Sequence, residues 1–124
     1  MIGYITLGTN DIDRAAAFYD ELFATIGAGR LMEGDNYIAW GRSMQEPGIS
    51  VITPYDGKPA TVGNGVMIAI AAGSTELVDA VHAKALELGG TDEGPPGERN
   101  GGFYAAYFRD LDGNKLNAFC MVGS

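Results

Sequence analysis

Apolar and polar residues follow the same order twice along this chain. An apolar run at 2–8 is followed by a segment, 12–26, whose apolar residues recur every three or four positions. This spacing places them on one face of an amphipathic helix. A second apolar run at 66–72 is followed by a second such stripe at 77–88, and glycines follow both stripes. The pattern therefore predicts a strand and then a helix at the start of each half.

Short strand-like segments follow each predicted helix. In the first half they lie at 29–33, 37–42 and 48–53, and in the second half at 103–109 and 115–122, with a weaker candidate within 91–102. Between the halves, the stretch 54–65 holds two prolines and three glycines. We therefore expect one α+β domain of two βαβββ modules, with module one at 1–54, a linker at 55–64 and module two at 65–124.

The two halves match in pattern more than in residue identity. When 4–27 is aligned with 67–90, only three of the 24 paired positions are identical. Two equal modules imply a pseudo-twofold axis, and a site on that axis would take corresponding residues from each half. The repeat therefore indicates where functional side chains should lie.

The amino-acid composition limits the classes of partner that the protein is expected to bind. Sixteen acidic and eight basic residues give a net charge of −8, which disfavours nucleic acid and anionic membranes and could attract a cationic ligand. No apolar run approaches the roughly 20 residues of a membrane span. The first residues lack a basic region, and Cys120 is the single cysteine, so we expect a cytoplasmic protein whose thiol is a small core residue.

Two segments carry a resemblance to a known family. Asn10 to Tyr19 follows the first strand, and Phe108 to Leu116 reads FRDLDGNKL, with Leu111 where the family usually has proline. With the repeat, these segments resemble the vicinal oxygen chelate superfamily of glyoxalase I, bleomycin-resistance proteins and extradiol dioxygenases. The resemblance implies two curved sheets that enclose a cleft, with the helices outside.

The resemblance also implies where a metal would bind. Metal-dependent members hold a divalent ion with one ligand from the first and one from the last strand of each module, such as His, Gln or Glu. The corresponding residues here are Tyr4, Val51, Met67 and Asn117. None is a usual ligand for such an ion, and valine cannot coordinate at all. We therefore expect no bound metal and no other cofactor.

Other catalytic groups are sparse. The only histidine, His82, lies in the second predicted helix, so we expect it on the surface or half-buried and outside the cleft. No Ser/His/Asp or Cys/His set has a histidine in a useful place. Arg99 lies in a predicted loop that covers the cleft in many relatives, where it could meet an anionic ligand or be solvated.

Strand alternation predicts which residues line the cleft. Thr6 shares a face with Tyr4, and Phe119 shares one with Asn117, while Trp40 and either Tyr104 or Tyr107 are candidate walls. The expected ligand-binding residues are Tyr4, Thr6, Trp40, Val51, Met67, Tyr104, Asn117 and Phe119. The alternative is that these side chains simply fill the space between the sheets.

The first functional hypothesis is a homodimeric, metal-free protein that binds and sequesters a small organic molecule in the cleft between the modules. The second is a metal-dependent lyase, isomerase or dioxygenase of the glyoxalase type, which the residues at the ligand positions disfavour. A metal-independent enzyme on the same fold is the third.

Overall fold

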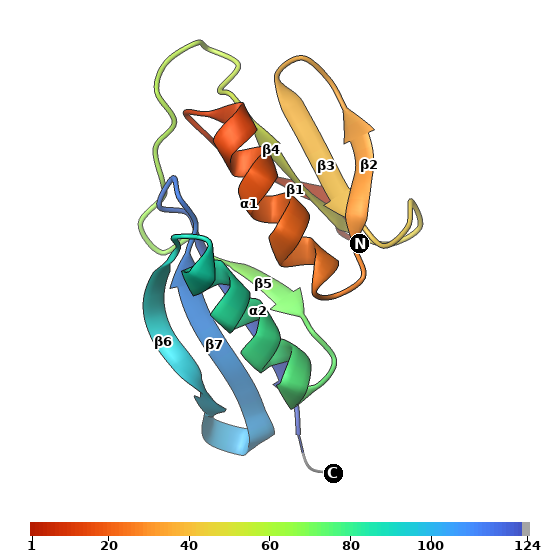
Figure 1. Ribbon diagram of the computed structural model, residues 1–124, viewed down its shortest axis with the longest axis vertical. Helices are drawn as coiled ribbons and strands as arrows, with labels where there is room; N and C mark the ends of the chain where they lie inside the picture. Colours follow the sequence, from red (N-terminus) through yellow and green to blue (C-terminus); the bar gives the residue numbers. More distant parts are fainter. Residues whose placement is uncertain (123–124) are drawn as a thin grey trace.

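The computed structural model describes residues 1–122 and contains two modules of one topology (Figure 1). Module one comprises β1 (Tyr4–Gly8), α1 (Ile12–Ala24), β2 (Gly29–Glu33), β3 (Tyr37–Gly41) and β4 (Gly48–Ile52). Module two comprises β5 (Ile68–Ala71), α2 (Thr75–Glu87), β6 (Thr91–Glu98), a short 3₁₀ turn (Asn100–Gly102), β7 (Phe103–Arg109) and β8 (Lys115–Met121). This confirms the predicted α+β class and the two βαβββ modules.

Each module forms its own four-stranded sheet. The strand orders are β1-β4-β3-β2 and β5-β8-β7-β6, so β1 and β5 are edge strands. The β1–β4 and β5–β8 pairs are parallel, because a helix separates the first strand from the other three, and the remaining pairs are antiparallel.

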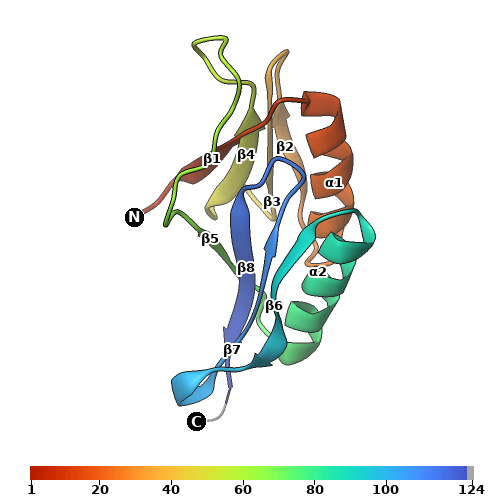
Figure 2. The same ribbon diagram turned by 90° about the vertical axis from the view of Figure 1, so that its left-hand side faces the viewer.

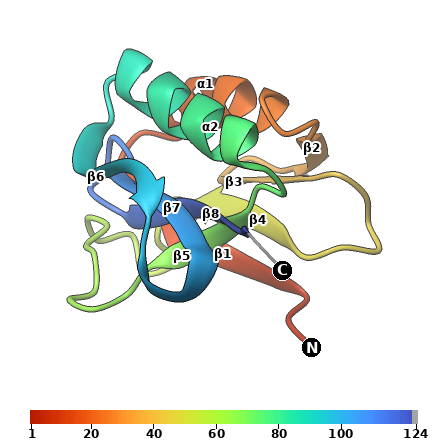
Figure 3. The same cartoon turned by 90° about the horizontal axis from the view of Figure 1, so that it is seen from below.

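The two helices lie side by side on one side of the molecule, and both sheets lie on the other (Figures 2 and 3). Each sheet therefore has one face packed under its helix, here called the helix face, and an opposite face, here called the open face. The largest buried side chains, including Trp40, Leu22, Val78 and Phe108, form the core between helices and sheets.

Short polar side chains start both helices. The Asp11 carboxylate accepts a hydrogen bond from the backbone N–H of Arg14, and the Ser74 hydroxyl accepts one from Leu77. Each satisfies an N–H group that the first turn leaves without a helical partner.

A polar cluster joins the hairpin between β7 and β8 to module one. The buried Tyr19 hydroxyl donates to Asp110 at 2.6 Å, and the Asn114 side-chain amide donates to the Gly8 carbonyl at 3.0 Å. Asp112 accepts from the Thr9 hydroxyl at 2.6 Å and from the Asn10 backbone N–H at 3.0 Å. The DLDGN segment is therefore a clasp between the modules, and we call these residues the inter-module clasp.

No helix within residues 1–122 is long and apolar enough to cross a membrane.

Candidate functional site

Strand register determines which side chains of module one point to its open face. Tyr4 pairs with Gly48 and Thr6 pairs with Ser50, whereas Leu7 pairs with Val51. Leu7 and Val51 are 6% and 1% exposed and belong to the core, but Tyr4 is 71% exposed. Tyr4 and Thr6 therefore occupy the open face, together with Ser50.

The predicted orientation of Val51 is wrong by one residue. Neighbouring side chains of a strand point to opposite faces, so a one-residue error in alignment moves a residue from one face to the other. The open-face residue is Ser50, whose hydroxyl lies 2.8 Å from that of Thr6 and donates to the Ile5 carbonyl at 3.3 Å.

On the open face of module two, Asn117, Phe119 and Tyr107 lie together. Asn117 pairs with Ala69 on one side and Tyr107 on the other, and Phe119 pairs with Ala71 and Ala105. Met67 precedes β5 and is 39% exposed. The structure thus brings Asn117 and Phe119 to one face, as alternation predicts.

Tyr104 and Trp40 point instead to the helix faces. The Tyr104 hydroxyl donates to Asp79 of α2 at 2.7 Å, and this bond, burial and the carboxylate charge raise the pKa of Tyr104. Trp40 is 1% exposed, and its indole N–H donates to Asp20 of α1 at 2.8 Å. The residue with the orientation expected of Tyr104 is Tyr107.

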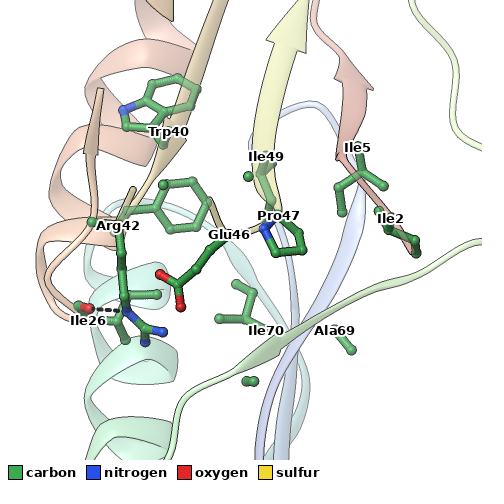
Figure 4. A pocket seen from close by; sticks show the side chains of 15 residues that line it. Ile2, Ile5, Ile26, Trp40, Arg42, Glu46, Pro47, Ile49, Ala69 and Ile70 are labelled. Carbon is green, nitrogen blue, oxygen red and sulfur yellow. Dashed lines mark hydrogen bonds between the residues drawn. The ribbon is translucent and has the colours of Figure 1, made fainter. Parts of the chain in front are cut away.

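A pocket of about 380 Å³ lies between the modules (Figure 4). Module one contributes most of its wall, and the edge strand β5 of module two closes the other side. Its lining residues are Ile2, Ile5, Phe23, Ile26, Ala28, Trp40, Gly41, Arg42, Glu46, Pro47, Gly48, Ile49, Ala69, Ile70 and Ala71. Of the predicted site residues, Trp40 alone is among them.

The pocket has an apolar side and a charged side. Ile2 and Ile5 lie opposite Arg42 and Glu46 in the close view (Figure 4). The Arg42 side chain donates to the Ile26 carbonyl at 3.0 Å, which holds it at the rim. Periodicity could not reveal this pocket, because it lies at the junction of the modules.

A divalent metal does not fit the side chains at the positions that the resemblance indicates. On β1, β4, β5 and β8 the open-face side chains are hydroxyl, amide, ammonium, thioether, aromatic or aliphatic: Tyr4, Thr6, Ser50, Ile52, Ala69, Ala71, Lys115, Asn117, Phe119 and Met121. Imidazole and carboxylate, which such ions prefer, are missing from this set. Throughout residues 1–122, no three His, Cys, Asp or Glu side chains are grouped to hold an ion.

His82 lies away from this set, but it is more buried than predicted. It is 5% exposed, its Nε2 lies 2.9 Å from Asp92, and its ring meets the edge of Phe108. The prediction of a surface or half-buried residue is wrong because α2 packs His82 against β6 and β7. Cys120 is buried in the core.

Comparisons with known proteins identify the family. A family model of the glyoxalase/bleomycin resistance protein/dioxygenase superfamily matches residues 1–118. A glyoxalase/bleomycin resistance protein from Albidiferax ferrireducens is 39% identical, with a TM-score of 0.91 over 98% of this chain and 99% of that chain.

More distant structures share the fold. A lactoylglutathione lyase from Agrobacterium tumefaciens is 20% identical, with a TM-score of 0.70 over 97% of this chain and 92% of that one. The fosfomycin resistance protein FosX from Mesorhizobium loti is 16% identical, with a TM-score of 0.69 over 98% of this chain and 92% of that one. No curated protein matches this chain. Because the family model spans nearly the whole chain, the protein belongs to the glyoxalase/bleomycin resistance protein/dioxygenase superfamily.

Proposed function

We propose that this protein binds a small organic molecule in the pocket between its modules and holds no divalent metal ion on its open faces. The observation that carries this proposal is the pocket itself, with about 380 Å³ of space and walls formed mainly by isoleucine, alanine and aromatic side chains. Ligand pockets of proteins commonly have about 300–1,000 Å³ and a mainly apolar lining with a few polar groups. An apolar or aromatic body is the chemistry that suits this site.

The chemistry of the open-face side chains supports a metal-free site. Tyr4, Ser50 and Asn117 are weak ligands at best for the ions that imidazole and carboxylate bind. A metal-dependent lyase or dioxygenase would need such ligands on these strands. The lyase from A. tumefaciens shares the fold with this chain, and at 20% identity that likeness extends to the fold alone.

A bulky residue at the pocket wall tests the proposal. Ala71 lines the pocket and is exposed, so Ala71→Phe would fill space there with little disturbance of the core. The neutral fluorescent probe N-phenyl-1-naphthylamine should bind the wild type at one saturable site. In Ala71→Phe its affinity should fall at least about tenfold, or about 1.4 kcal/mol.

Ala83→Phe is the matched control, because Ala83 is an exposed residue of α2 away from the pocket. It should bind the probe as the wild type does. Failure of the probe to bind the wild type, or unchanged binding in Ala71→Phe, would exclude this pocket as the ligand site.

Exposed apolar side chains favour the homodimer predicted from the sequence. Tyr4 and Met121 are 71% and 64% exposed near the open faces, and a second copy that covered them would remove apolar surface from water. The homodimer and the cytoplasmic location stay predictions, to be tested by the mass in solution and by cell fractionation.

A further inference from the structure

Two basic side chains converge on one aromatic ring on the open face of module two. The Arg99 guanidinium carbon lies 5.5 Å from the centre of the Tyr107 ring, and the Lys115 ammonium lies 5.6 Å from it. Both distances are in the range of cation–π attraction. Both cations therefore contact the same Tyr107 ring.

Strand β6 holds Arg99 in a defined position. Its guanidinium donates to the Gly97 carbonyl at 2.8 Å and to the Pro95 carbonyl at 3.0 Å. A Cβ atom on Gly97 or Gly94 would lie 3.0 or 3.3 Å from the guanidinium nitrogens, so both glycines leave space for it. Arg99 is thus a half-buried, oriented side chain and not a solvated loop arginine.

The ion pairs of the described residues leave these two cations out. Within residues 1–122, neither Arg99 nor Lys115 forms an ion pair, whereas nearby Arg109 pairs with Glu93 at 3.3 Å. The ring attracts the cations without cancelling their charge. Both cations are therefore free of ion pairs within residues 1–122, in a protein whose net charge is −8.

Asn117 supplies an independent sign that a ligand binds here. It neighbours Tyr107 across the β7–β8 ladder, is 1% exposed, and its Oδ1 atom has no hydrogen-bond partner. A buried carbonyl oxygen without a donor costs about 1–3 kcal/mol, so such atoms are rare in folded proteins. A ligand with an N–H or O–H group would satisfy it.

We propose that this corner, where Arg99 and Lys115 both contact the Tyr107 ring, binds the acidic group of a small organic acid, and that a neighbouring hydroxyl or amine of the same molecule donates to Asn117. The inference rests on the proposed function, because Asn117 pairs with Ala69, which lines the pocket for the apolar body. An anionic ligand thus replaces the cationic one that the net charge favoured.

Matched probes with one apolar chain test the charge of the ligand. Isothermal titration calorimetry would compare 2-hydroxyhexanoate, neutral 2-hydroxyhexanamide and 1-hydroxypentylphosphonate. The carboxylate or the phosphonate should bind at least about tenfold more tightly than the amide, and the tighter of the two identifies the type of acid. Hexanoate, which lacks the hydroxyl, should bind more weakly than 2-hydroxyhexanoate, and this difference should vanish in Asn117→Ala.

Charge-removing variants test the two basic residues. Arg99→Gln and Lys115→Gln should each weaken binding of the preferred acid at least about tenfold. Lys58→Gln, in the exposed linker and outside any ion pair among residues 1–122, should leave it unchanged. If Arg99→Gln fails to fold because the hydrogen bonds of Arg99 to β6 are lost, Lys115→Gln still tests whether positive charge is needed for acid binding.

Equal binding of the acids and the amide would overturn the anionic site, and so would wild-type affinity for acids in both glutamine variants. Binding of N-phenyl-1-naphthylamine reports on the pocket separately. Normal probe binding without acid preference would leave the proposed function standing and remove this inference. Acid binding that depends on Arg99 and Lys115, without probe binding, would support this site and exclude the apolar pocket.

Discussion

The Tyr19 hydroxyl illustrates how single residues hold this fold together. It is buried, and the Asp110 carboxylate that accepts its hydrogen bond also accepts bonds from the Asp112 and Asn114 backbone N–H groups. Burial, and then the negative charge of Asp110, raise the pKa of Tyr19 well above its ordinary value. The folded state therefore favours the neutral phenol.

Tyr19→Phe should lower the free energy of unfolding by about 1–3 kcal/mol at neutral pH, because a buried carboxylate oxygen loses a donor. Because the pKa of Tyr19 is raised in the folded state, the stability that this group contributes is complete below the unfolded-state pKa of about 10. It decreases progressively as the pH rises above that value. The variant should lose stability less steeply in that range. Urea denaturation from pH 8 to about pH 11 measures both effects.

Tyr55→Phe is the control, since Tyr55 is 99% exposed, and it should change neither the stability nor the slope. An identical alkaline slope in Tyr19→Phe and the wild type would contradict the assigned role of Tyr19.

At the residue scale, the sequence predicts strands better than it predicts the faces of individual side chains. Tyr4, Thr6, Asn117 and Phe119 share the open faces because regular alternation relates each pair along one strand. Val51 faces the helix, opposite to the prediction, because it pairs with the buried Leu7, and a family pattern that is one residue out of register reverses the predicted side. The convergence of Arg99 and Lys115 on Tyr107 depends on the path of β6, which no local pattern encodes.

At the scale of elements, the two modules use corresponding glycines for different reasons. Gly27, after α1, has φ of +75°, and an added Cβ would meet nothing within 4 Å. Gly90, after α2, is not in the left-handed region, but a Cβ there would lie 2.7 Å from the Arg109 carbonyl and 2.8 Å from that of Ala85. One position needs the backbone freedom of glycine, and the other needs the space.

Asparagine substitutions separate these two requirements, since asparagine adopts left-handed backbone more readily than alanine. Gly27→Ala should cost about 1–2 kcal/mol of stability, and Gly27→Asn should cost less. Gly90→Ala and Gly90→Asn should both cost about 1–3 kcal/mol, because each forces atoms into occupied space. Chemical denaturation of the four variants measures this.

Gly29→Ala is a suitable control, because an added Cβ there meets nothing within 4 Å and the backbone is not left-handed. These separate roles would be contradicted if Gly90→Asn were more stable than Gly90→Ala. They would also be contradicted if Gly27→Asn were no more stable than Gly27→Ala.

Strand β6 shows the limit of element prediction. The stretch 91–98 contains Pro95 and Pro96, which favour a loop. It nevertheless pairs with β7 as a strand, and the register of this pairing shifts at two places. Proline is tolerated there because β6 is an edge strand, where one side of the backbone needs no partner.

At the scale of the whole molecule, the internal repeat predicts the two sheets but not how they are joined. Contacts between α1 and α2 and the inter-module clasp fix the two modules side by side. The apolar pocket results from that junction, between the edge of module one and β5. Its position depends on packing between modules, which the pattern within each module does not specify.

Metal content after reconstitution is the most direct test of metal-free binding. Purified protein would be incubated without oxygen with an excess of Zn²⁺, Ni²⁺, Mn²⁺ or Fe²⁺, desalted, and measured by elemental analysis. Because the open-face side chains are poor ligands, we expect well under about 0.1 ion per chain, and no change in thermal stability on chelation. About one tightly held ion per chain, whose removal by a chelator lowers the melting temperature, would contradict the metal-free site.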